Sequence, residues 1–283
     1  MELFEEIVMA VNEELGISDL VTQTSNNIIS MIAQKSGRKL SAGNQKSGSI
    51  NGVNIFGKKI DIYYTVFFVK SIDDVNTINC IWSGGYNDDL NRLTTTIVYV
   101  EDENRYVDYT GTTQHELEHI YQTVKAKKNL LSVPKTTKIY VAAKNLMRSK
   151  DFFEQVVGYS VYYANKFERD GYANTYYRMI LDDPKRPPIE IIKETSVFKN
   201  LKIINDVIDR NTPYAIQAIE NICMGRFGKH FNWWKNLSKR TISNYFTKVG
   251  KVIAKIEKER QGGLVDTNKT ITPLPQFIKE DND

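Results

Sequence analysis

Five residues constrain this chain more than any other stretch: His115-Glu116-Leu117-Glu118-His119. Residues four apart lie on one face of a helix, so His115 and His119 direct two imidazole nitrogens at a single point. The pattern H-E-x-x-H on a helix is typical of a zinc site. Glu116 is placed to act as general base toward a water in the metal's open position, whereas Glu118 is expected to face solvent. The ordinary alternative is an amphipathic helix with solvated His and Glu side chains.

The flanks of this motif favour the metal site. A run of β-branched and aromatic residues, 94–100, precedes it, and Gly111-Thr112-Thr113 offers a hydroxyl cap for the helix. The order of strand, loop and H-E-x-x-H helix resembles the zincin metallopeptidases. The resemblance implies a Zn²⁺ cofactor, an edge strand that holds an extended peptide beside the zinc helix, and an endopeptidase activity on a protein or peptide substrate.

A zinc peptidase of this kind needs a third protein ligand. One zincin subgroup takes a third histidine six residues after the second, behind a glycine turn, but Gln122 and Lys125 stand at those positions. His230 lies over a hundred residues away. A downstream carboxylate is therefore the economical choice, as in the gluzincins, whose third ligand is a Glu on a separate helix.

Three carboxylates are candidates for this third ligand. Glu154 and Glu168 fall in a predicted helix over residues 150–181, on nearly the same face and about 21 Å apart, so only one can serve. Glu168 is favoured because the small residues Ala164 and Gly171 would let the zinc helix approach closely. The run 168–173 also resembles the ligand helix of intracellular gluzincin-like peptidases, although Arg169 and Gly171 depart from its commonest form.

Asp170 is the remaining candidate, either as a hydrogen-bond partner of a ligating His or as the ligand itself. The ordinary interpretation of Glu168 is a surface carboxylate among basic neighbours. With a His₂Glu site, the resemblance implies that Glu116 takes the proton of a zinc-bound water as it attacks the scissile carbonyl. The oxyanion then needs a further donor, which is either His230 or one of the sixteen tyrosines.

Away from the motif, residue patterns predict an α+β, zincin-like fold in which a small, mostly antiparallel sheet precedes a helical half. Val, Ile, Tyr and Phe gather in four segments that predict strands: 53–56, 60–69, 77–82 and 94–100. A Gly/Ser/Asn-rich loop is predicted at 41–52. Apolar spacing and capping residues predict helices at 3–15, 20–34, 112–127, 138–148, 150–181, 213–224 and 231–260.

Residues 1–110, with the N-terminal helices and the sheet, are expected to form one domain with the helical half, 111–260, which carries the zinc motif and a basic C-terminal helix. The polar tail, 261–283, is expected to be disordered. The chain of 283 residues is long enough for a sizeable core.

Composition indicates the cellular compartment in which this chain is expected to work. Cys80 and Cys223 are far apart, which is typical of core thiols in a reducing compartment. The acidic start lacks the pattern of a secretory signal, and no apolar run approaches a membrane span. A cytoplasmic protein without a membrane partner is therefore expected, or a virion-associated one if the chain is encoded by a phage.

The segment from Arg226 to Arg260 carries ten Lys and Arg against two Glu, interleaved with aromatic residues such as Trp233 and Trp234. Basic residues with interspersed aromatics suit a nucleic-acid backbone and its bases. The preferred interpretation is an amphipathic helix whose aromatics pack inward and whose lysines are solvated. Three hypotheses remain: a cytoplasmic zinc endopeptidase of bacterial or phage type, a zinc protease associated with DNA, and a non-enzymatic assembly or packaged protein with a zincin fold.

Overall fold

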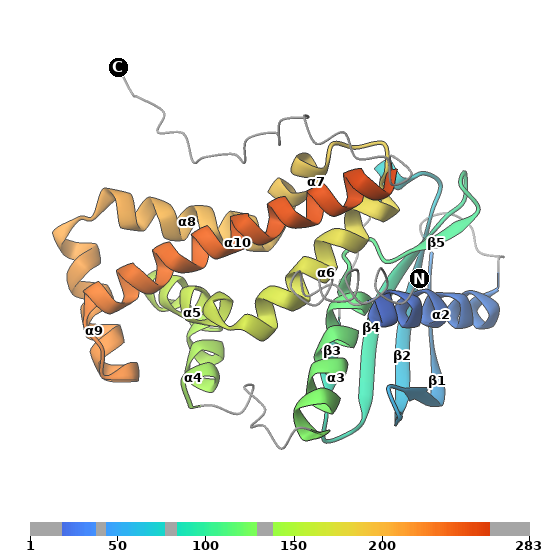
Figure 1. The fold of residues 1–283 in the computed structure, drawn as a ribbon, viewed down its shortest axis with the longest axis horizontal. Coiled ribbons are helices and arrows are strands. Elements are labelled where there is room, and N and C mark those ends of the chain that lie inside the picture. Colours follow the sequence, from blue (N-terminus) through green and yellow to red (C-terminus); the bar gives the residue numbers. More distant parts are fainter. Residues whose placement is uncertain (1–18, 38–43, 77–83, 129–137, 261–283) are drawn as a thin grey trace, which may run out of the picture. The chain divides into compact units, whose positions relative to one another are not determined.

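The computed structural model of this chain describes residues 19–37, 44–76, 84–128 and 138–260. The expected helix at 3–15, the strand at 77–82, Cys80 and the tail 261–283 lie outside these residues. The fold is α+β, with one small mixed sheet and many helices (Figure 1).

The chain divides into two compact units. Unit 1 comprises Met1–Ser132 and Asp170–Arg186, and unit 2 comprises Val133–Arg169 and Pro187–Asp283. The motif helix is part of unit 1 because Leu117 and Ile120 pack into the same apolar cluster as the strands. The motif helix therefore belongs with the sheet.

Unit 1 contains the sheet, whose strand order is β1-β2-β4-β3, with β5 also paired to β4. The strands are β1 (Gln45–Ile55), β2 (Lys58–Val69), β3 (Gly85–Asn87), β4 (Arg92–Val100) and β5 (Arg105–Val107). β2 and β4 are parallel, and the other three pairings are antiparallel. The sheet is thus mixed, with the expected antiparallel majority.

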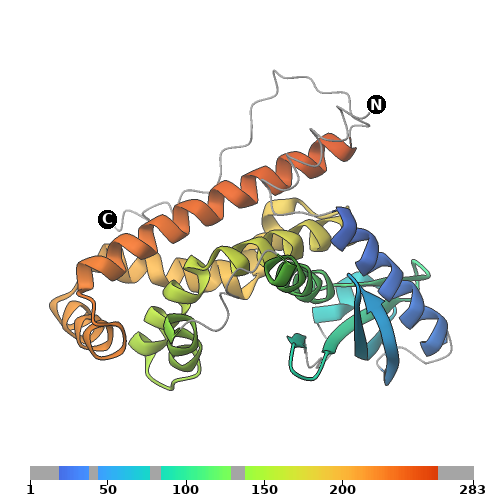
Figure 2. The same cartoon turned by 60° about the horizontal axis from the view of Figure 1, so that its bottom comes forward.

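Alternation along β2 and β4 gives the sheet two apolar faces. On one face Ile62 and Ile97 meet α2 (Asp19–Ser36) and α3 (Thr112–Lys128). On the other, Val69 and Val98 belong to a smaller cluster beside η1 (Ile72–Asn76). Figures 1 and 2 show α2 and α3 together on one face of the sheet.

Two strands were not expected at their positions. β1 begins at Gln45, inside the predicted polar loop, because its backbone pairs with β2 over nine residue pairs, from Gln45↔Phe67 to Ile55↔Lys58. β3 is three residues long and lies within the predicted turn around Gly84. It pairs with the start of β4, while β5 pairs with the end of β4. Among the strands that the structure describes, β4, which the sequence placed before the motif, is therefore internal, and β3 forms the edge beside α3.

Unit 2 is helical. Its helices are α4 (Lys138–Met147), α5 (Phe152–Ala164), α7 (Pro188–Glu194), α8 (Ser196–Arg210), α9 (Pro213–Phe227) and α10 (Phe231–Arg260). α5 packs against α4, α8, α9 and α10. α8 and α10 run side by side (Figures 1 and 2). α6 (Lys166–Asp182) begins in unit 2 and continues into unit 1 as one uninterrupted helix.

The single helix expected over 150–181 is wrong, because it is divided at Asn165. Asn165 is extended, with ψ 126°, and closes α5 by donating its backbone N–H to Tyr162. Its side-chain oxygen then accepts the N–H of Phe167 at 3.0 Å, which starts α6. Glu154 and Glu168 consequently lie on different helices.

Other boundaries follow the sequence closely. Thr212 caps α9 and Pro213 occupies its first turn, as predicted. α10 has the predicted bounds, and α6 ends at Asp182, just before the proline-rich stretch. None of the helices in the described residues is long and apolar enough to cross a membrane.

Candidate metal centre

α3 brings the two motif histidines together as predicted. The Nε2 atoms of His115 and His119 are 3.0 Å apart, and the two side chains belong to residues only 8% and 2% exposed. Two nitrogens bound to one tetrahedral zinc, each at 2.0–2.1 Å, would be separated by about 3.3 Å. The helix thus presents two buried imidazole nitrogens at nearly the spacing that a shared metal ion requires.

The outer nitrogens of both rings have oxygen partners. Nδ1 of His115 lies 3.3 Å from Oγ1 of Thr175, and Nδ1 of His119 lies 3.2 Å from Oε1 of Gln122. If each Nδ1 donates its hydrogen to that oxygen, the Nε2 lone pairs are left to face each other. Partners of this kind set the tautomer and ring orientation of metal-binding histidines.

α6 supplies the third candidate ligand. His115, His119 and Glu168 each offer a ligand atom, and these atoms all lie within 4.8 Å of one another in a buried group that could hold a metal ion. Glu168 is counted with unit 2, but it stands on the same continuous helix as Gly171 and Thr175, which contact His115.

Gly171 permits the close approach of α6 to the motif helix. A Cβ atom at this position would come within 2.8 Å of Cε1 and 2.9 Å of Nδ1 of His115. Real Cβ atoms essentially never show such distances, so a larger residue would displace the ring. The close approach expected at Gly171 is confirmed, whereas Ala164 is the last residue of α5 and is not on this helix.

Glu168 is fully buried, and its carboxylate accepts hydrogen bonds from two phenols. The Tyr140 hydroxyl donates to Oε1 at 2.6 Å, and the Tyr162 hydroxyl donates to Oε2 at 2.6 Å. Burial of a carboxylate is costly unless hydrogen bonds satisfy it, and the two phenols supply those bonds from α4 and α5. The expected alternative, an exposed surface carboxylate, is wrong.

Glu116 and Glu118 differ from each other in their surroundings. Glu116 is half-buried, and its Oε2 accepts the backbone N–H of Tyr86 on the edge strand β3 at 2.8 Å. Glu118 was expected to face solvent, but it is 5% exposed and accepts hydrogen bonds from Gln122 and Asn174. The expectation failed because Asn174 of α6 contacts the Glu118 carboxylate, so α6 covers this face of α3.

The first turn of α3 is capped by a buried carboxylate and not by the expected hydroxyls. Oδ2 of Asp108 accepts the backbone N–H of Gln114 at 3.1 Å, while the Thr112 and Thr113 hydroxyls bond to Thr110 and Thr95. Burial raises the pKa of Asp108 to about 6, with Arg178 opposing and Asp182 reinforcing the shift.

The two alternative ligands are not members of the metal-ligating cluster. Glu154 is in the first turn of α5, where its carboxylate is 3.8 Å from the Arg226 guanidinium. Asp170 is buried, and its backbone oxygen accepts a hydrogen bond from Asn174. In the part of the chain that the structure describes, the clustered metal-ligating side chains are those of His115, His119 and Glu168.

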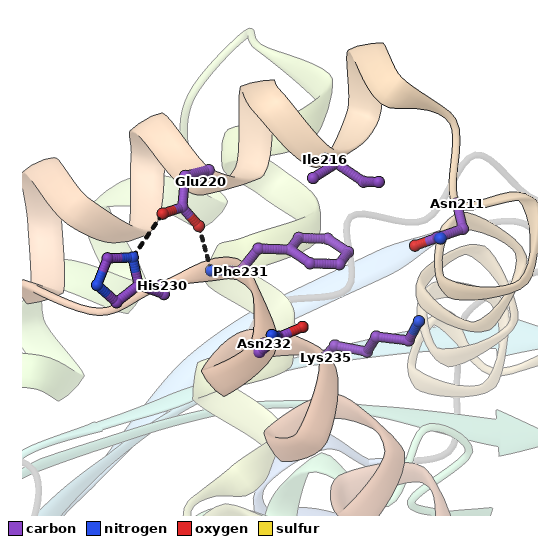
Figure 3. Close-up of a pocket in the computed structure, with 7 residues that line it drawn as sticks. All are labelled: Asn211, Ile216, Glu220, His230, Phe231, Asn232 and Lys235. Carbon is purple, nitrogen blue, oxygen red and sulfur yellow. Dashed lines mark hydrogen bonds and ion pairs between the residues drawn. The ribbon is translucent and has the colours of Figure 1, made fainter.

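His230, one of the candidate oxyanion donors, forms an ion pair with Glu220. It precedes α10 in unit 2, is largely exposed, and places Nδ1 2.6 Å from Oε1 of Glu220 (Figure 3). The other oxygen of Glu220 accepts the backbone N–H of Phe231, so this pair closes the start of α10. Both residues line a cavity of about 450 Å³. A role for His230 at the metal centre stays a prediction without support from this placement.

The basic C-terminal helix has the packing that was preferred on sequence grounds. Trp234 is fully buried and Tyr245 is 4% exposed, whereas the cations Lys239, Arg240 and Lys258 are exposed. Trp233, half-buried, contacts the Phe227 ring at a centroid distance of 5.6 Å. The aromatics thus pack inward, and they do not form an exposed platform for stacking bases.

Comparison with known proteins adds no relative: no protein-family model matches this sequence, and neither the curated proteins nor the solved structures contain a match. The site therefore rests on its own geometry. Sequence reasoning missed four residues of it, Tyr140, Tyr162, Thr175 and Gln122. Only Gln122 carried a signal, because it lies three residues after His119 on the same helix.

Proposed function

We propose that this chain is a zinc-dependent metallopeptidase of the gluzincin kind, which hydrolyses peptide bonds. The observation that carries the proposal is the buried cluster of His115, His119 and Glu168. Two neutral imidazoles and one carboxylate suit Zn²⁺, as in known hydrolytic sites with three protein ligands and an open fourth position. When bound there, zinc would supply the Lewis acidity that lowers the pKa of a water molecule toward neutrality.

The chain's own residues support the remaining roles. Glu116 directly follows the first histidine of the motif and is half-buried, which supports it as the group that accepts the proton of the attacking water. The neighbouring strand β3 forms a sheet edge beside α3, and an extended peptide can add to such an edge through main-chain hydrogen bonds. This arrangement favours an endopeptidase that binds its substrate as an added strand.

Metal analysis and a hydrolysis assay together test the proposal. The purified protein should carry about one zinc per chain, and His115→Ala should lose it. Glu116→Gln keeps the shape of the side chain but cannot take a proton. It should retain zinc and hydrolyse casein at least about a hundredfold more slowly.

Each failure has a distinct meaning. Full zinc occupancy in His115→Ala would contradict the proposed zinc site. A metal-free but folded Glu116→Gln variant would indicate that Glu116 is a zinc ligand. Zinc without any hydrolysis would favour the assembly or packaged protein that keeps a zincin-like fold. DNA binding that weakens steeply with salt would favour the DNA-associated protease.

A further inference from the structure

The carboxylate of Glu168 has an unusual setting for a side chain with no exposed surface. Its two oxygens each accept one phenolic hydrogen, from Tyr140 on α4 and from Tyr162 on α5, and both distances are 2.6 Å. Hydrogen bonds from neutral donors to a charged acceptor are short and strong. Because the donors come from two different helices, they fix both the position and the plane of the carboxylate.

The two phenols are themselves held in place. Their rings stack at a centroid distance of 5.5 Å with an interplanar angle of 29°, and the residues are 5% and 9% exposed. Two constrained donors leave the carboxylate few orientations.

We propose that Tyr140 and Tyr162 are positioning residues that hold Glu168 in the orientation in which it ligates the metal. This inference rests on the proposed zinc site and assigns it two residues that the H-E-x-x-H motif does not contain. The tyrosines compensate the burial of the carboxylate before a metal arrives, so the site is formed in the folded apo-protein. They set metal affinity without touching the metal.

The test removes one hydroxyl at a time and keeps the ring. Tyr140→Phe and Tyr162→Phe should each weaken Zn²⁺ binding by about 10- to 100-fold, measured at pH 7 by competition with a chromophoric chelator. The double variant should bind more weakly than either single variant. Tyr159→Phe is the matched control, because Tyr159 lies on α5 and contacts the Tyr163 ring, and its affinity should stay at the wild-type value.

Two further readouts separate positioning from a general structural role. The rise in melting temperature on adding Zn²⁺ should shrink in both Phe variants, whereas a merely structural role would lower the apo and zinc-bound melting temperatures equally. The visible absorption of added Co²⁺ should change in intensity, because it reports the geometry around the ion. Circular dichroism checks the fold, and since each hydroxyl serves a different oxygen, either folded variant can decide the question.

A parallel Glu168→Gln variant distinguishes the possible failures. Wild-type affinity in Glu168→Gln would overturn the proposed ligand set and with it the function. Lost affinity in Glu168→Gln combined with unchanged affinity and Co²⁺ spectrum in both Phe variants would overturn the positioning role alone.

Discussion

α3 and α10 are both rich in polar residues, yet they bury opposite kinds of side chain. The buried face of α3 includes Gln114, His115, Glu118 and His119. The buried face of α10 is largely apolar, with Trp234, Val249 and Ile256 among its members. A buried polar group costs free energy unless it is satisfied, and partners such as Thr175 and Asn174 supply that compensation for α3. The share of charged residues is similar in the two helices, but the kind of side chain that each helix buries is different.

The largest effect should come from the apolar face of α10. Trp234→Ala removes a fully buried ring and should lower the free energy of unfolding by about 3–5 kcal/mol, measured by urea denaturation. Trp233→Ala, at a half-buried position, should cost less than half as much. Equal small losses in both variants would contradict the packing described for this helix.

The buried cap of α3 should make stability depend on pH. Because the pKa of Asp108 is raised to about 6 in the folded state, the native protein binds more protons than the unfolded chain between about pH 4 and 6. The contribution of Asp108 to the free energy of unfolding is therefore fully present below pH 4 and is lost as the pH rises through 6. This change amounts to up to about 3 kcal/mol.

Asp108→Asn keeps an oxygen that can accept the Gln114 N–H but no longer titrates. In this variant the free energy of unfolding should vary less between pH 4 and 7 than in the wild type. An identical pH profile in the two proteins would show that Asp108 does not carry the shift.

Gly171→Ala should damage the metal site more than the fold. The added methyl group overlaps the His115 ring, so we expect a loss of about 1–3 kcal/mol in stability and a clear fall in zinc affinity. Gly225→Ala on α9 is the control, because a Cβ there meets nothing within 4 Å. It should be neutral or stabilising by about 0.4–1 kcal/mol. Unchanged zinc affinity in Gly171→Ala would contradict the close contact between α6 and His115.

The smallest effect should come from the exposed cations of α10. Replacing Lys239, Arg240 and Lys258 together by Gln should change stability by no more than about 0.5 kcal/mol for each residue. We expect the wild type to show no DNA binding near micromolar concentration at physiological salt. DNA binding that falls steeply with salt and disappears in the triple variant would instead indicate that α10 binds nucleic acid.

Local signals predicted much of this architecture. The Thr212-Pro213 cap, the bounds of α10 and the end of α6 before Pro184 all depend on residues close in sequence. The break at Asn165 was missed because apolar residues continue on both sides of it. β3 was missed because three residues beside Gly84 look like a turn until β4 provides a partner.

Residues of the candidate metal centre also differ in how far the sequence predicted them. Helical spacing alone identifies His115, Glu116 and His119, and the small residue Gly171 identified the correct face of α6. Tyr140 and Tyr162 lie 28 and 6 residues before Glu168, on other helices, and the chain has sixteen tyrosines. Burial of Glu118 likewise depends on Asn174, which is distant in sequence. Contacts made only by tertiary packing leave no local pattern to find.

The hydrogen bond from the Tyr86 backbone to Glu116 bears on how this chain tolerates mutation. A main-chain N–H belongs to every amino acid except proline. Position 86 can therefore change its side chain and still restrain the Glu116 carboxylate, provided that β3 keeps its path. The Tyr86 side chain itself packs on the core and bonds Asp88 through its hydroxyl, so most substitutions should lower stability. In a mutational scan, only proline at position 86 should also remove the hydrogen bond to Glu116.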